Sequence, residues 1–152
     1  MALVHVQASG SNLVRTGGSC DGCPDATAVS EGQIADNGFV EFIAPEQGTL
    51  RYVGLAPGGP GTSPGDLSFA LRLQNGVVEV RENNVYRVEH QFAAGDMFRI
   101  AVESGGGIVV LGRQGPAQAF RVADLRGSYP AWSPDGTMIA LAATIDPIAS
   151  YN

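Results

Sequence analysis

Two cysteines, Cys20 and Cys23, form the first pattern in the sequence that could carry chemistry. A C-x-x-C pair serves redox catalysis when it opens a helix after a strand, because the helix dipole lowers the pKa of one thiol. Here glycine, aspartate and proline surround the pair, and no helix is expected after it. The spacing therefore indicates either a small local disulfide or two reduced thiols in a glycine-rich loop.

Metal chemistry would need more ligands than this pair supplies. A structural zinc site takes four ligands, and the only histidines are His5 and His90, which no spacing places near the cysteines. His90 is expected on an apolar strand face together with Tyr86, Val88 and Phe92. A lone histidine in that position is usually a packed or rim residue, so we predict no metal site and no cofactor.

Glycoside hydrolysis requires two carboxyl groups that flank the scissile bond, about 5 to 9 Å apart. Residues i and i+2 of a strand lie on one face about 6.5 to 7 Å apart, so a Glu-x-Glu or Glu-x-Asp pattern would supply such a pair. In this chain Arg81 follows Glu79 at that spacing, which predicts a solvated ionic face, and Glu82 is expected at a turn. The sequence also lacks a nucleophile-elbow motif, and we predict that the protein is not an enzyme.

Sugar binding without catalysis needs exposed aromatic rings that stack on sugar faces, with acidic or amide side chains for the hydroxyls. The candidates lie in predicted loops: Trp132 is the best stacking ring, and Tyr129, Asp135 and Asp66 accompany it. Further loop candidates are Asp21, Asp25, Asp36 and Asn37. The acids form no calcium-loop pattern. Each could instead cap a turn through a bond between its side chain and the backbone, and Trp132 could equally belong to the core.

The elements that position these residues follow from composition and periodicity. The chain has 152 residues, of which 44% are hydrophobic, which is enough for one domain spanning residues 1–152. Its 21 glycines and 9 prolines argue against long helices. Alternation with a period of two residues dominates instead, which is typical of strands that are buried on one face. On Phe39–Ala44, for example, it places Phe39, Glu41 and Ile43 on one face.

The clearest strands lie between residues 67 and 111, where turn signals such as Asn75–Gly76 and Asn83–Asn84 separate the apolar runs. They predict a meander of about five strands. Its strands are Leu67–Leu73, Val77–Arg81, Val85–Phe92, Phe98–Val102 and Ile108–Leu111. Further candidates are Leu3–Ala8, Phe39–Ala44, Leu50–Leu55, Ala119–Val122, Tyr129–Trp132, Met138–Ala143 and Ile145–Ile148. We predict an all-β domain of roughly ten to twelve strands in two antiparallel sheets packed face to face.

The order of these strands resembles a known fold family. The resemblance rests on Phe39–Phe42, Leu50–Leu55, Leu67–Leu73, Val78–Tyr86 and Gly95–Glu103, preceded by the loop Gly17–Ala26. Together they resemble the concanavalin A-like lectin/glucanase sandwich, a jelly-roll carried by many bacterial extracellular proteins and phage appendages. SPRY-type domains share its Gly-Asp turn before an apolar strand. The resemblance implies a fold more firmly than an activity, and Ile108–Gly115 lacks the aromatic residues that such domains usually have there.

A second resemblance covers only Tyr129–Leu141, which is similar to one repeat of a TolB-type β-propeller. A propeller closes its ring from several repeats, and this chain contains one copy. We therefore interpret the segment as a hairpin around the turn Ser133–Gly136, where proline fixes φ and glycine accepts a positive φ.

The charge pattern excludes some classes of binding partner. The net charge is −6 and all nine basic residues are arginines, scattered along the chain, so we expect no nucleic-acid partner. No apolar stretch approaches the roughly 20 residues that span a bilayer, so we expect no membrane insertion. The start, Met1–Val6, lacks the basic and then apolar pattern of a signal peptide.

These observations predict a non-catalytic, lectin-like binding or adhesion module that recognises glycans through its loops. The alternative is a structural surface protein, such as a phage capsid decoration, a fibre or an extracellular assembly subunit, in which self-association covers exposed strand edges. Both interpretations imply an extracellular or virion-surface location. They imply a glycan, a surface protein or a second copy of the chain as the partner.

Overall fold

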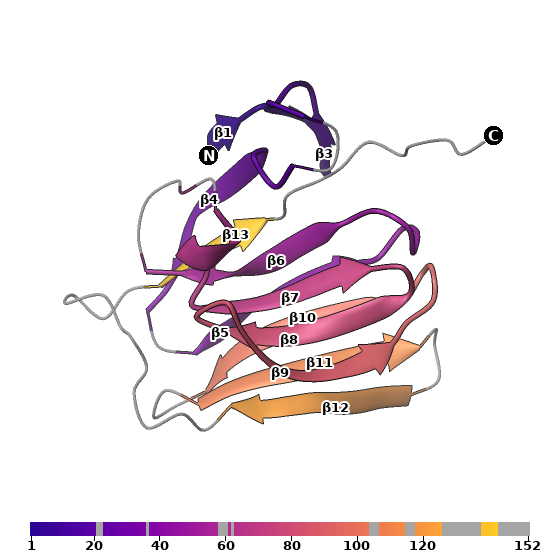
Figure 1. Cartoon of the computed structure of the whole chain (residues 1–152). Coiled ribbons are helices and arrows are strands. Elements are labelled where there is room, and N and C mark those ends of the chain that lie inside the picture. The colour runs from indigo at the N-terminus through magenta and orange to yellow at the C-terminus, as the bar shows by residue number, and fades with distance from the viewer. Residues whose placement is uncertain are drawn as a thin grey trace.

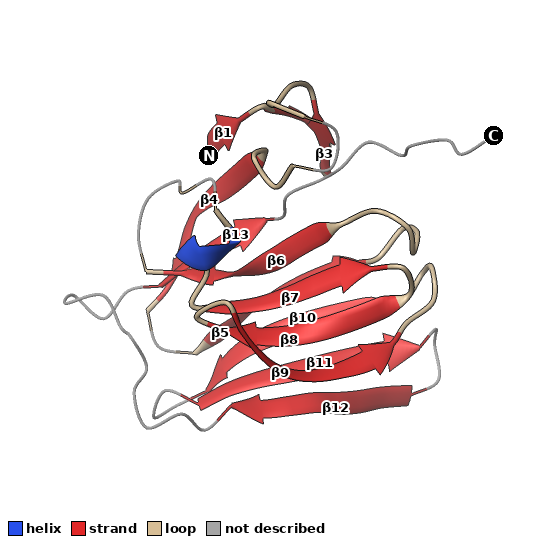
Figure 2. Ribbon diagram, in the orientation of Figure 1, coloured by secondary structure: helices blue, strands red, loops and turns tan. Residues whose placement is uncertain are grey.

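The computed structural model describes residues 1–20, 23–35, 37–57, 61, 63–103, 107–114, 118–125 and 138–142, and it describes side chains through residue 103. Within these ranges the chain forms thirteen β-strands and a single turn of 3-10 helix, η1 (Pro64–Asp66) (Figure 2). The predicted all-β class is therefore confirmed. The strands belong to three antiparallel sheets.

The largest sheet has seven strands, and the second has four. In spatial order the seven strands are β1 (Ala2–Val4), β4 (Thr27–Ile34), β13 (Met138–Ala142), β6 (Arg51–Ala56), β7 (Phe69–Gln74), β8 (Val77–Glu82) and β9 (Val85–Gln91). The four strands are β12 (Gln118–Leu125), β11 (Gly107–Gln114), β10 (Met97–Glu103) and β5 (Gly38–Ile43). A separate hairpin pairs β2 (Val6–Ser9) with β3 (Asn12–Arg15).

One hydrophobic core joins the two larger sheets. In Figure 1 strands β7 and β8 lie in front of β5 and β10, and β12 lies below β9. Alternate residues of each layer point into one buried cluster, which contains Leu71 and Val80 from the seven-stranded sheet and Phe98 and Ile100 from the four-stranded sheet. Because strand side chains alternate between faces, the residues between these positions lie on the outer faces.

Two asparagine turns connect β7, β8 and β9 as the sequence predicted. Asn75 and Gly76 have φ values of 51° and 73°, and Asn83 and Asn84 have values of 48° and 63°. Two consecutive residues of positive φ match the right-handed twist of the flanking strands, and asparagine and glycine tolerate this conformation best. The strand boundaries on either side lie within two residues of the predicted ones.

The predicted five-strand meander is wrong at one point, because the chain changes sheets after β9. Strands β7 to β9 are neighbours in the seven-stranded sheet, whereas β10 and β11 belong to the four-stranded sheet. The connection is held by Asp96, which is 4% exposed and whose Oδ2 accepts a hydrogen bond from the Ala93 N–H at 2.8 Å. Its backbone carbonyl accepts from the Ala44 N–H at 2.9 Å, beside the end of β5. Alternation identifies the apolar face of a strand but not the sheet to which the strand belongs.

The predicted apolar face of β9 is also wrong in part. Val88 lies opposite Val80, but the register then shifts, and Tyr86 lies opposite Arg81. This bulge moves Tyr86 to the outer face, where 49% of its surface is exposed. His90 is exposed as well, because β9 is the edge of its sheet.

The N-terminal region departs from the single strand predicted over Leu3–Ala8. His5 has a φ of 54°, and the chain breaks there into β1, which pairs with β4, and β2, which pairs with β3. Alternation failed to predict β4 because residues 30–33 are all partly or fully exposed. Strand β13 confirms the candidate at Met138–Ala143, whereas Tyr129–Trp132, Ser133–Gly136 and Ile145–Ile148 lie outside the described residues.

The core makes a direct prediction for Phe98, which is 0% exposed and contacts Phe92 and Phe42 at ring-centroid distances of 5.9 and 5.7 Å. We expect Phe98→Ala to lower the free energy of unfolding by about 3 to 5 kcal/mol, because it leaves a buried cavity. The matched variant Phe39→Ala removes a ring that is 54% exposed and should cost less than about 1.5 kcal/mol. Urea denaturation measures both values, and similar costs would contradict the proposed core.

Candidate functional site

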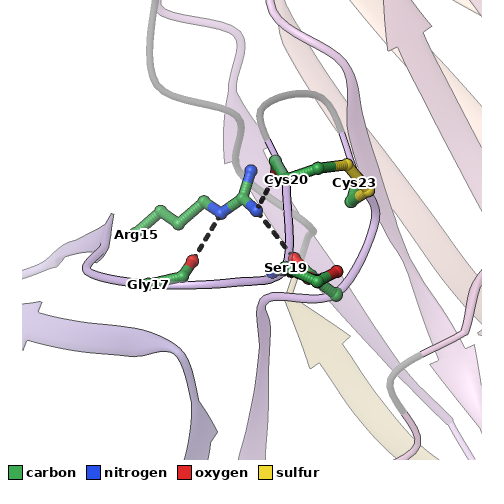
Figure 3. The surroundings of a disulfide bond; sticks show 6 residues. Arg15, Gly17, Ser19, Cys20 and Cys23 are labelled. Atoms are coloured by element: carbon green, nitrogen blue, oxygen red, sulfur yellow. Dashed lines mark hydrogen bonds and ion pairs between the residues drawn. A yellow bond between two sulfur atoms is a disulfide. The ribbon is translucent and has the colours of Figure 1, made fainter.

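The loop after β3 contains the two cysteines, which the structure joins by a disulfide (Figure 3). Their Cα atoms lie 5.3 Å apart, and the sequence had left open whether the thiols were oxidised or reduced. The Asp25 N–H donates to the Cys23 carbonyl at 2.9 Å. A ring closed over so few residues removes little entropy from the unfolded chain, so the disulfide shapes this loop more than it stabilises the fold.

Arg15, at the end of β3, holds the same loop from inside. Only 5% of its side chain is exposed. Its Nε donates to the Gly17 carbonyl, and its Nη2 donates to the Cys20 carbonyl and to Asp25 Oδ1, each at 2.7 Å (Figure 3). Planar guanidinium geometry lets one side chain bind several acceptors at once. The arginine is therefore the centre of the loop and is not presented to a ligand.

Asp25 completes this arrangement and is a loop cap. Its Oδ2 accepts hydrogen bonds from the Ser19 backbone N–H and from Ser19 Oγ, the latter at 2.6 Å. The Ser19 backbone bond, followed by the Ser19 hydroxyl and the charge of Arg15, lowers the pKa of Asp25. Gly18 has a φ of 134°, and a Cβ atom there would lie 2.2 Å from Arg15 Nη2. The loop thus requires glycine at this position, and Asp25 fits the capping alternative.

Asp66 also serves as a cap. Its Oδ2 accepts from the Ser63 N–H at 2.9 Å, and Ser63 Oγ accepts from the Gly65 N–H at 3.2 Å. This reciprocal pair is a capping box at the start of η1. Of the other predicted ligands, Asn37 is exposed. The remaining candidates lie outside the described residues: Asp21, Asp36, Tyr129, Trp132 and Asp135.

The predicted ionic face lies on the outer side of β7 and β8. Glu79 Oε1 accepts from Arg72 Nη1, and its Oε2 accepts from Arg81 Nε, each at 2.8 Å. The three side chains are between 16% and 23% exposed, so they are more sheltered than a fully solvated face would be. In the described part of the chain, no group of three or more His, Cys, Asp or Glu side chains could hold a metal ion.

A different surface stands out on the outer side of the four-stranded sheet. Phe39 on β5 is 54% exposed, and the Arg99 guanidinium on β10 lies 3.9 Å from the centre of its ring. Arg99 Nε and Nη2 both donate to Glu41 Oε2, at 2.8 and 2.6 Å. We call Phe39, Glu41 and Arg99 the Phe39 face. Alternation placed Phe39 and Glu41 together, but no sequence signal joined them to Arg99, 58 residues away from Glu41.

No protein-family model matches this chain, and no curated protein matches it. In the residues that the structure describes, no helix combines the length and the apolar character needed to cross a membrane.

One further carboxyl group lies in the connection between β5 and β6. Glu46 Oε2 accepts from the Gly48 and Thr49 N–H groups at 2.5 and 3.0 Å, and Glu46 forms an ion pair with Arg51. Burial alone would raise the pKa of Glu46, but the bonds with Thr49 and the charge of Arg51 outweigh it and lower this pKa. The turn therefore favours an ionised carboxylate.

Asp25 and Glu46 together predict how stability changes with acid. Their lowered pKa values mean that the folded state favours both carboxylates. Their stabilisation is fully present above the ordinary pKa values of 3.8 and 4.5 and is lost as the pH falls through the lowered values. We expect Tm to fall as the pH drops below about 4.5.

The double variant Asp25→Asn/Glu46→Gln tests this assignment. It should have a lower Tm than the wild type at pH 7 and a smaller further loss in acid, because it carries neither titrating group. Glu103→Gln, which changes an exposed carboxyl group, is the matched control and should follow the wild type. A double variant with the same acid dependence as the wild type would show that other groups control it.

Proposed function

We propose that this protein is a non-catalytic, lectin-like module that binds glycans at a cell or particle surface. The observation that carries the proposal is the Phe39 face: an exposed aromatic residue whose ring has, over one side, an arginine that is fixed by a carboxylate. Phe39 is 54% exposed, and the side chains of Arg99 and Glu41 are 37% and 31% exposed. All three groups are therefore accessible to a ligand.

The chemistry of these groups suits a sugar. The C–H face of a pyranose is apolar and packs on an aromatic ring, while its hydroxyl groups need hydrogen-bond donors and acceptors. Arginine donates, the carboxylate accepts, and bonds to charged groups are stronger than bonds between neutral ones. Because Arg99 is already held by Glu41 and by the ring, it would lose little conformational entropy when a ligand binds.

The finer architecture belongs to the same proposal. A shared core between two antiparallel sheets supports a jelly-roll sandwich of the concanavalin A-like type. Trp132, Tyr129 and Asp135 stay predicted ligand contacts in this proposal, and Asp66 stays one as well, although its Oδ2 already accepts the capping bond from the Ser63 N–H. The disulfide between Cys20 and Cys23 supports an extracellular or virion-surface location, since disulfides persist in oxidising compartments.

Binding to an array of bacterial and host glycans, followed by titration of the strongest ligand, tests the proposal. We expect Phe39→Ala to weaken that ligand at least about tenfold, which is about 1.4 kcal/mol of binding free energy. Tyr86→Ala is the matched control, because Tyr86 is an aromatic residue of similar exposure, 49%, on the other sheet. It should change the affinity less than about twofold.

Further variants locate the glycan-binding site and show which results would contradict the proposed function. Trp132→Ala tests the loop contacts separately from the Phe39 face, and a larger effect there would place the ligand on the loops. Far-UV circular dichroism and urea denaturation show whether each variant is folded. Clean negatives across the array, or an unchanged affinity in both Phe39→Ala and Trp132→Ala, would overturn the proposed glycan function.

A further inference from the structure

The four-stranded sheet ends in an apolar edge at β5. On one side β5 pairs with β10, and among the described residues no strand pairs with its other side. Phe39 and Ile43, which point outward, are 54% and 57% exposed. The inward side chains of Val40 and Phe42 on β5 are only partly buried. The residues opposite them on β10, Ile100 and Phe98, are 0% exposed.

Strand β9, one of the two edge strands of the seven-stranded sheet, is built differently. Strand β9 contains a bulge and exposes Arg87, Glu89 and His90. Bulges and charged side chains are the usual means by which proteins prevent strand edges from pairing with other chains. Strand β5 pairs with β10 over six residues with no register shift, and its one charged side chain, Glu41, is bound by Arg99. Of these two edges, only β9 is protected.

We propose that two copies of this chain associate through antiparallel pairing of their β5 strands. The two-fold axis passes beside Glu41, so that Phe39 lies opposite the partner subunit's Ile43 and Val40 lies opposite the partner subunit's Phe42. The two four-stranded sheets then form one continuous sheet of twice the width. This proposal goes beyond glycan binding and does not depend on it.

The register follows from the side chains. A slip of one residue would turn the outward side chains of one copy toward the core face of the other. A slip of two residues would place Phe39 opposite the partner's Glu41, or Glu41 opposite the partner's Ile43, and would lose the apolar pairs on the outer face. In the proposed register apolar residues face apolar residues on both faces of the sheet. Its one cost is that Glu41 faces the partner's Glu41, although Arg99 beside each carboxylate reduces this repulsion.

A second consequence concerns the Phe39 face. Both copies of Phe39 would lie on the same side of the joined sheet, because strand pairing preserves the alternation of faces. A ligand with repeated sugars could then contact two sites at once, and avidity would exceed the affinity of one site. The dimer would equally suit a structural subunit.

Cysteine cross-linking tests the register. In the background Cys20→Ser/Cys23→Ser, the variant Glu41→Cys should form a covalent dimer on mild oxidation, because residues opposite each other in antiparallel strands lie about 4.5 to 5.5 Å apart between Cα atoms, within disulfide range. Phe39→Cys and Ile43→Cys should not cross-link alone, since each of these residues lies about 13 Å from the same residue of the partner subunit. A mixture of the two should cross-link. Cross-linking of Phe39→Cys alone, or none with Glu41→Cys, would overturn the register.

Analytical ultracentrifugation of the native chain tests the association itself. We expect a dimer whose dissociation constant rises at least about tenfold in Ile43→Lys and falls in Glu41→Gln, which removes the facing charges. Val85→Lys is the matched control, because Val85 is 55% exposed on the protected edge β9; it should leave the dimer unchanged. A chain that is monomeric at millimolar concentration, or one that Val85→Lys dissociates equally, would overturn the proposal.

The two proposals fail in different ways. Ile43 lies outside the Phe39 face, so the monomeric variant Ile43→Lys should keep the glycan affinity of a single site and lose only the avidity toward repeated sugars. Loss of the dimer with glycan binding intact, or the reverse, shows which proposal stands. Circular dichroism confirms that each variant is folded.

Discussion

The packing of β7 and β8 against β10 is the interaction on which the rest of the structure depends. Leu71 and Val80 from one sheet meet Phe98 and Ile100 from the other in a cluster from which water is excluded. Burial of such side chains contributes about 1.5 to 3 kcal/mol each. Because side chains alternate along a strand, the inward position of Phe98 determines that Arg99 points outward.

Hydrogen bonds connect the two sheets near the points where the chain crosses from one to the other, after β5 and after β9. The Gln47 carbonyl accepts from the Gly76 N–H at 3.2 Å, and Gln47 Nε2 donates to the Phe92 carbonyl at 2.6 Å. The Phe92 N–H in turn donates to the Gly76 carbonyl at 2.9 Å. These bonds satisfy backbone groups that the crossings would otherwise leave unpaired. They also fix how the β7–β8 turn lies relative to both crossings, and so limit sliding of one sheet over the other.

Local features of the fold could be predicted from the sequence, whereas its long-range pairings could not. Alternation predicted the inward face of β10, and Asn75–Gly76 predicted the turn between β7 and β8. Both signals lie within a few neighbouring residues. The change of sheet after β9 depends on Asp96 and Ala44, which are far apart in the chain. The Phe39 face likewise joins β5 to β10. The sequence candidates Asp25 and Asp66 proved to be caps, an alternative that their turn-forming neighbours had already suggested.

The disulfide loop has a consequence for how the protein matures. This chain has two cysteines, so within one molecule only one pairing can form, and no exchange between wrong pairings is needed. Since the two residues are three positions apart, their sulfur atoms meet often even in an unfolded chain. The sheets, by contrast, must bring together residues such as Glu41 and Arg99 from distant segments, which is slow for β-rich proteins. Oxidation can thus precede assembly of the core, so that the disulfide loop is already closed when the sheets form.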